Sequence, residues 1–127
     1  METIDNVEIF STGTWNGDTY KESDLDDIVN SFSETKGALK PYVKLGHDPN
    51  QKLLQNDGYP SAGRIESIKR VGNKLVAKLN NVPRVIKELI DKGAYNRVSS
   101  EIFWNLEMDG KKYKKALKAI ALLGANT

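Results

Sequence analysis

The sequence predicts an α+β fold, a small and mostly antiparallel β-barrel with helices packed on its outside. Most segments of the chain are rich in β-forming residues or alternate apolar and polar residues, which is typical of strands. Two segments instead repeat apolar residues at helical spacing, and each lies between predicted strands. No internal repeat and no linker divides the chain, so we expect residues 1–127 to form a single domain.

The N-terminal part is expected to contain a strand, a turn and a helix. Residues 7–12 are rich in β-forming side chains, and turn-forming residues follow them directly. Ser23, with Asp26 three positions later, resembles a short capping box, so we expect the helix to begin there. Gly37 is expected to end this helix. Its apolar stripe consists of Leu25, Ile28, Val29 and Phe32.

The next segment, residues 42–47, is expected to be a strand that ends at the only histidine of the chain. Alternation would place Val43, Leu45 and His47 on one face of this strand. Residues 48–61 are polar and rich in turn formers, which predicts a long loop beside His47. Long loops within compact domains are usually functional or disordered.

The second half of the chain is expected to form two hairpins with a helix between them. The first hairpin pairs residues 62–71 with residues 74–80, and the second pairs residues 97–106 with residues 111–123 around an Asp-Gly turn. Pro83 fits the first turn of the helix, and Gly93 fits its end. The apolar face of that helix consists of Val85, Ile86, Leu89 and Ile90.

Composition excludes several kinds of chemistry. The chain has no cysteine, so disulfides and thiolate nucleophiles are excluded. It has no apolar run of about 18 residues and no secretory signal, so we expect a cytoplasmic protein without a membrane partner. A net charge of +2 argues against nucleic acid as a partner, although five lysines between positions 111 and 118 keep a single-strand-binding barrel as a third hypothesis.

Two neighbouring serines fall on opposite faces of the strand predicted over residues 97–106. Alternation places Ser100 on an apolar face with Val98, Ile102, Trp104 and Leu106. Ser99 and Glu101 then point together towards a cleft or solvent. A serine nucleophile needs a base, which is usually an imidazole, and only His47 can supply one. A polar strand face without chemistry is the alternative interpretation, because the sequence does not show that His47 and Ser99 meet.

No metal or other cofactor is expected. The side chains that would have to ligate a metal, His47, Asp48, Asp57 and Glu66, match no known ligand spacing. The chain also lacks a phosphate-binding glycine loop and a dinucleotide motif.

Several motifs of the chain resemble the Mu-like phage I protein family, the prohead protease and scaffold of tailed phages and prophages. The most specific are Gly-His-Asp at 46–48, Ala-Gly at 62–63, Val-Ser-Ser-Glu at 98–101 and Ala-Leu-Leu-Gly-Ala at 121–125, and the resemblance covers about residues 6–126. This family is similar to the herpesvirus assemblin proteases, which are serine proteases with a small closed β-barrel surrounded by helices. The resemblance implies an assemblin-like serine endopeptidase of capsid maturation, with residues 1–127 as its protease domain and a C-terminal scaffold segment missing.

The resemblance also implies roles for individual residues. His47 would be the general base and Ser99 the nucleophile, with Ser100 as the alternative nucleophile. In related prohead proteases a glutamate of the last strand is the proposed third member, and its position here is Ala119. Glu101 and Asp48 are therefore the candidates for the third member. Arg64 and Arg97 are candidate helpers of the backbone N–H groups that would bind the oxyanion.

The implied partners are the phage scaffold, the major capsid protein and a second copy of the chain in a homodimer. The enzyme would cleave the scaffold, and also itself, inside the immature capsid in the host cytoplasm. The second hypothesis is a non-enzymatic capsid assembly module with a protease-like fold, which the absence of a glutamate at position 119 favours.

Overall fold

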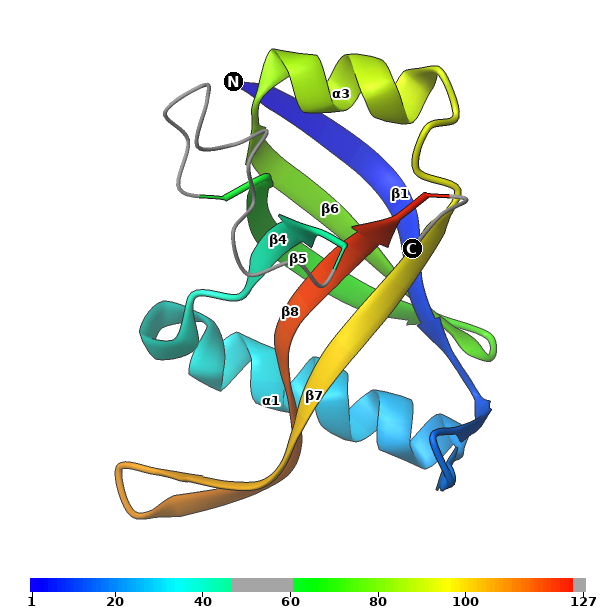
Figure 1. The fold of residues 1–127 in the computed structure, drawn as a ribbon. Helices are drawn as coiled ribbons and strands as arrows, with labels where there is room; N and C mark the ends of the chain where they lie inside the picture. Colours follow the sequence, from blue (N-terminus) through cyan, green and yellow to red (C-terminus); the bar gives the residue numbers. More distant parts are fainter. Residues whose placement is uncertain (47–60, 125–127) are drawn as a thin grey trace.

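The computed structural model describes residues 1–46 and 61–124, which form a six-stranded sheet, a small two-stranded sheet and two helices (Figure 1). The strand order of the large sheet is β1-β6-β5-β4-β8-β7. Its strands are β1 (Glu2–Ser11), β4 (Tyr42–Leu45), β5 (Gly63–Val71), β6 (Lys74–Val82), β7 (Arg97–Met108) and β8 (Lys111–Leu123). The small sheet pairs β2 (Gly13–Trp15) with β3 (Asp18–Tyr20), and the helices are α1 (Glu22–Leu39) and α3 (Arg84–Asp91).

The predicted fold, an α+β barrel with helices outside, is wrong. Among the described residues 57% lie in strands and 24% in helices, and the sheet is open rather than closed into a barrel. Its two edge strands, β1 and β7, approach each other but share no backbone ladder. The pairing of β1 with β6 shifts register three times. Such bulges bend and twist a strand, and they are a common reason why a sheet edge does not continue into a regular ladder.

The sheet is mostly antiparallel, with one parallel pair between the fourth and fifth strands of its order. β4 runs parallel to β8, whereas every other pair in the large sheet is antiparallel. β8 therefore lies between β4 and β7, which are far apart in sequence. This arrangement determines which residues share a face near the predicted site.

The predicted hairpins are present in the structure. β5 and β6 turn at Gly72, whose φ of +61° is left-handed. β7 and β8 turn at Asp109 and Gly110, with φ values of +53° and +77°. Positive φ at both central residues is the geometry of the type I′ turn that an Asp-Gly pair favours.

Helix α1 is longer than the sequence predicts. It begins one residue before Ser23, and the carboxylate of Asp24 accepts a hydrogen bond of 2.7 Å from the backbone N–H of Lys21. The helix continues through Gly37 to Leu39. It ends at Lys40, which has a left-handed φ of +49° and precedes a proline.

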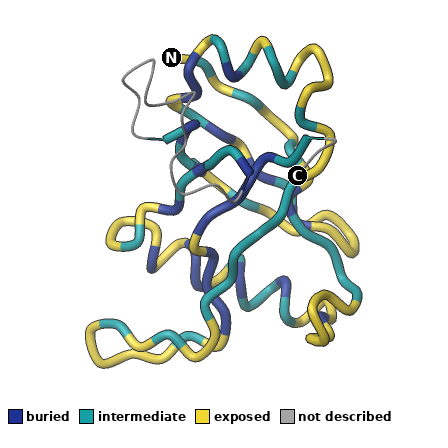
Figure 2. Tube along the Cα trace, viewed as in Figure 1, coloured by how far each residue is buried: buried dark blue, intermediate teal, exposed yellow. Residues whose placement is uncertain are grey.

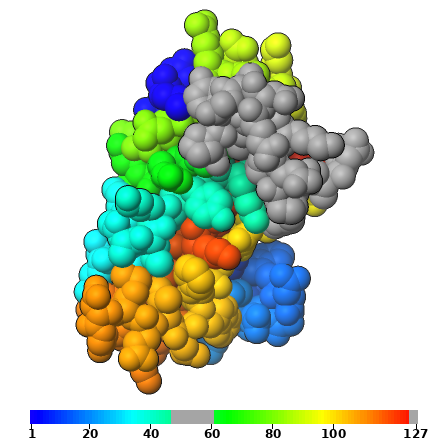
Figure 3. Space-filling view, turned by 60° about the vertical axis from the view of Figure 1, so that its left-hand side comes forward, coloured from blue at the N-terminus to red at the C-terminus, as the bar shows by residue number. Residues whose placement is uncertain are grey.

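The hydrophobic core lies between the curved sheet and the inner face of α1. Leu25, Ile28 and Phe32 of α1 are buried against β8 and β5, and Ile86 of α3 is buried at the other end (Figures 1 and 2). The far end of the β7–β8 hairpin lies at the end of the molecule opposite α3 (Figure 3). Within the described ranges no helix is long and apolar enough to span a membrane.

Candidate functional site

The two neighbouring serines of β7 have different environments because the pleat of the strand turns them to opposite faces. Ser100 pairs across the sheet with Ile120 of β8, which in turn pairs with Val43 of β4, and both of these partners are fully buried. Ser99 pairs with Ala121, which pairs with Lys44. The predicted assignment of Ser100 to the core face and Ser99 to the other face therefore agrees with the register.

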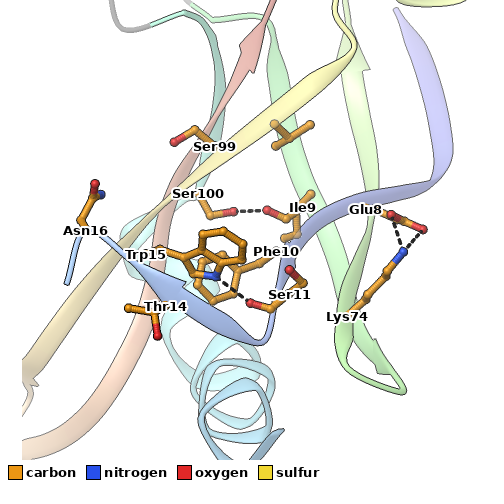
Figure 4. Close-up of a pocket in the computed structure, with 11 residues that line it drawn as sticks. Glu8, Ile9, Phe10, Ser11, Thr14, Trp15, Asn16, Lys74, Ser99 and Ser100 are labelled. Carbon is orange, nitrogen blue, oxygen red and sulfur yellow. Dashed lines mark hydrogen bonds and ion pairs between the residues drawn. The ribbon is translucent and has the colours of Figure 1, made fainter. Parts of the chain in front are cut away.

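The hydroxyl of Ser100 is engaged in the structure. It donates a hydrogen bond of 2.6 Å to the backbone carbonyl of Ile9 in β1, which links the two edges of the open sheet (Figure 4). Ile9 is only 2% exposed, so its carbonyl oxygen depends on a protein partner. A nucleophilic role for Ser100 would require breaking this hydrogen bond.

Ser99 lies beside a surface groove of about 570 Å³ between β7, β1 and the β2–β3 hairpin. Its hydroxyl points away from Ile9 (Figure 4), and within residues 1–46 and 61–124 we see no hydrogen bond that occupies it. The groove is lined by Glu8, Ile9, Phe10, Ser11, Thr14, Trp15, Asn16, Lys74, Val98, Ser99 and Ser100. A groove of this size is large enough for part of a peptide.

Glu101, a candidate third group, forms an ion pair that the sequence did not predict. The Nζ atom of Lys44 lies 2.5 Å from Oε2 of Glu101, and both side chains are about three-quarters buried. Lys44 and Glu101 meet because they lie on the same face of the sheet as Ser99, on either side of β8. Alternation within residues 43–45 could have predicted that Lys44 lies on the face opposite the core. It could not have predicted that Lys44 lies close to β7.

Ala119 occupies the position at which related proteases carry a glutamate. It is fully buried and is the direct cross-strand partner of Glu101. Side chains of direct cross-strand partners lie about 5 Å apart. Glu101 therefore lies on β7, directly across from the position of β8 at which related proteases carry a glutamate.

His47 and Asp48, the predicted base and the other candidate third group, lie outside the described residues. The strand that leads to them ends at Leu45, and Gly46 has a left-handed φ of +55°. Within the described residues the alternation of this strand therefore extends to Leu45.

The described residue next to His47 has a defined position. Gly46 donates a 2.8 Å hydrogen bond to the carbonyl of Leu122, and Leu122 pairs with Val98 of β7. Two strand spacings, or about 10 Å, therefore separate Gly46 from β7.

The two predicted arginine helpers are placed differently. Arg64 of β5 pairs with Tyr42, which pairs with Ala119 and then with Glu101, so three strand spacings of about 14 Å in total separate it from β7. The structure therefore does not bring Arg64 to Ser99. Arg97 lies two positions before Ser99 on the same face, and its Nη2 atom donates to the carbonyl of Gly124 at 3.5 Å.

An aromatic cluster borders the groove through Phe10. The ring of Tyr20 packs edge-on against Phe10 and Trp104, with centroid distances of 4.8 and 5.6 Å, and the Tyr20 hydroxyl accepts a 3.1 Å hydrogen bond from the Trp104 indole. The ammonium of Lys115 lies 4.3 Å from the centroid of Trp104 and 2.9 Å from the carboxylate of Asp24. These contacts join the β2–β3 hairpin, β7, β8 and α1.

The prediction that Trp104 belongs to the buried face is wrong, because its side chain is 45% exposed. The register of β7 and β8 shifts between Glu101 and Ile102, and the next residue after Trp104, Asn105, has a left-handed φ of +52°. Both features interrupt the simple alternation on which the prediction relied.

No group of acidic or histidine side chains that could hold a metal is found within the described part of the chain. Comparisons of the chain with protein-family models, curated proteins and solved structures find no match. The resemblance to the Mu-like phage I proteins therefore stays a prediction.

Proposed function

We propose that the chain is a serine endopeptidase of phage capsid maturation, with Ser99 as the nucleophile. The observation that carries this proposal is the contrast between the two serines: the Ser100 hydroxyl bonds to Ile9, whereas Ser99 lines a groove large enough for part of a peptide and its hydroxyl makes no hydrogen bond within the described residues. The motifs at residues 46–48 and 98–101 support the same assignment. The substrates would be the internal scaffold and the enzyme itself, inside the immature capsid in the host cytoplasm.

In the proposed mechanism, Oγ of Ser99 attacks the carbonyl carbon of the peptide while His47 accepts the hydroxyl proton. The C–N bond breaks as His47 returns that proton to the leaving amine, which leaves an acyl-enzyme. Water then hydrolyses the acyl-enzyme, with His47 again as the base. The position of Gly46, two strand spacings from β7, supports the pairing of His47 with Ser99.

Glu101 is our choice for the group that orients His47. It lies on the face of Ser99 and directly opposite Ala119, where related proteases carry a glutamate. Its ion pair with Lys44 fixes the position of the carboxylate on that face, and an orienting group has to be held in place. Asp48, which follows the histidine directly, is the alternative.

The test is to express the full precursor together with the major capsid protein and to identify new termini by mass spectrometry. Ser99→Ala should abolish the new termini, and the matched variant Ser100→Ala should retain them. A fluorophosphonate probe, which reacts with activated serines, should label Ser99 in the Ser100→Ala protein. Normal processing by the Ser99→Ala precursor would show that the assignment is wrong.

A non-enzymatic assembly module is the second candidate function. Two observations favour it: no carboxylate stands at position 119, and the nearby carboxylate of Glu101 is bound to Lys44. In that case the probe would label no serine, and the Ser99→Ala precursor would assemble capsids as efficiently as the natural one.

A further inference from the structure

Trp15 is exposed to solvent yet held in one position. Its side chain is 46% exposed, although large aromatic residues are normally buried. The indole Nε1 donates a 3.0 Å hydrogen bond to the carbonyl of Ser11. The six-membered part of the ring lies over Gly13, where a Cβ atom would come within 2.8 Å of Cζ2 of the indole. The ring can therefore occupy this space only because Gly13 has no side chain.

The hairpin that carries Trp15 is itself well defined. Asn16 and Gly17 form a tight turn with φ values of +53° and +84°, and the hydroxyls of Thr14 and Thr19 lie 3.0 Å apart across the two strands. A fixed aromatic surface loses little conformational entropy when a ligand binds to it. This rigidity distinguishes Trp15 from an exposed side chain that happens to be apolar.

Trp15 lies between two adjoining hollows of the surface. It lines the groove beside Ser99, and it also lines a second pocket of about 390 Å³ whose walls include Phe10, Tyr20 and Trp104. The second pocket is also lined by Asp18 and by Glu101, whose carboxylate is paired with Lys44, and no lysine or arginine is among its described lining residues. Asp18, for which no ion pair is seen among the described residues, therefore favours a neutral or basic ligand over an acidic one.

We propose that Trp15 is a specificity-determining residue that binds a large apolar side chain of a neutral or basic peptide next to Ser99. This inference rests on the proposed function, because it takes the ligand of the groove to be a peptide. Buried aromatic contacts of this kind contribute a large share of the binding energy in peptide and protein recognition. A substrate with alanine or aspartate at the same place would lose this contact or place a charge near Asp18.

Binding can be tested without cleavage in a Ser99→Ala, Trp104→Phe protein, in which Trp15 is the only tryptophan. The probes are the blocked peptides Ac-Ala-Ala-Phe-Ala-Ala-NH2, its all-alanine counterpart and a version with aspartate in place of phenylalanine. The phenylalanine peptide should change the fluorescence of Trp15 and bind about tenfold more tightly than the other two. Equal binding of all three peptides would overturn the inference, as would a response to oligothymidylate and not to any peptide.

Three further variants identify the cause of any effect. Trp15→Ala should remove the preference for phenylalanine, and Trp15→Phe should retain most of it. Gly13→Ala, which pushes the indole from its position while keeping it in the chain, should weaken binding like Trp15→Ala. Val71→Ala, at a 54% exposed site in the β5–β6 hairpin, should have no effect. Circular dichroism would confirm that each variant is folded.

The two proposals can fail independently. If precursor cleavage depends on Ser99 but Trp15→Ala leaves the preference among fluorescence-quenched peptides unchanged, the role of Trp15 is wrong and the endopeptidase stands. If Trp15 selects the phenylalanine peptide but Ser99→Ala does not change precursor processing, the groove binds peptides and the endopeptidase is wrong.

Discussion

At the scale of single residues, the most informative feature is the difference between the environments of the adjacent residues Ser99 and Ser100. Strand pleating points Ser100 towards β1 and Ser99 towards the opposite face. A hydroxyl bound to a buried carbonyl contributes to the stability of the fold, whereas a hydroxyl at the surface of a groove contributes little. The two serines should therefore behave differently when each is truncated.

Ser100→Ala should lower the free energy of unfolding by about 1–3 kcal/mol, because it leaves the buried carbonyl of Ile9 without its partner. Ser99→Ala should change it by less than about 0.5 kcal/mol. Urea unfolding followed by circular dichroism measures both values. Equal effects of the two substitutions would contradict the assigned environments.

Asp24 provides a prediction about pH. The backbone N–H of Lys21, followed by the ammonium of Lys115, lowers the pKa of the Asp24 carboxyl below its usual value of 3.8. A carboxyl with a lowered pKa in the folded state stabilises the protein at pH values above 3.8, and this contribution is lost as the pH falls through the lower folded-state pKa. Stability should therefore decrease below pH 3.8 in part through this group.

Asp24→Asn should reduce the melting temperature at pH 7, and the difference from the unmodified protein should shrink as the pH is lowered below 3.8. Asp27→Asn on the same helix is the matched control, because no ion pair of Asp27 is seen among the described residues. Thermal unfolding of all three proteins across this pH range gives the comparison. A difference that stays constant with pH would show that Asp24 does not act through its charge.

At the scale of elements, helix α1 continues past Gly37, the residue at which its sequence predicts that it ends. The sequence predicts an end at Gly37, but the helix continues to Leu39 because its buried side chains, including Phe32 and Thr35, pack against the sheet. Gly37 lies inside the helix with no atom within 4 Å of the position that a Cβ would take. Tertiary packing often outweighs the propensity of one residue.

Gly37→Ala should therefore stabilise the protein by about 0.5–1 kcal/mol, because alanine loses less backbone entropy than glycine in a helix. Gly63→Ala should instead lower the free energy of unfolding by more than about 1 kcal/mol. Gly63 has a φ of +142°, and a Cβ there would lie 3.0 Å from the carbonyl of Asn80. Chemical denaturation of the two variants tests both signs, and a destabilising Gly37→Ala would show that the helix does not continue through this position.

At the scale of the whole molecule, sequence patterns predict the local elements well and their assembly poorly. The hairpin turns at Gly72 and at Asp109–Gly110 follow from short-range backbone chemistry. The parallel pairing of β4 with β8 joins segments more than 70 residues apart, and no local pattern specifies it. The open sheet edge was missed for the same reason, because the bulges of β1 arise from its pairing with β6.

For the candidate site, too, the sequence predicts features within one strand but not the contacts between strands. Alternation alone predicts that Ser99 and Ser100 lie on opposite faces, because it depends only on positions within one strand. The contact of Lys44 with Glu101 could not be predicted, since it depends on the order β4-β8-β7. The exposure of Trp15 and Trp104 also depends on how the β2–β3 hairpin packs against β7.

The position of β8 between β4 and β7 has a consequence for biosynthesis. Residues 42–45 and 97–101 leave the ribosome before residues 119–122, which join them in the sheet. A nascent or prematurely terminated chain that lacks this strand cannot hold the two flanking segments in register. The arrangement of β4, β8 and β7 beside the groove is therefore completed only after β8 has left the ribosome.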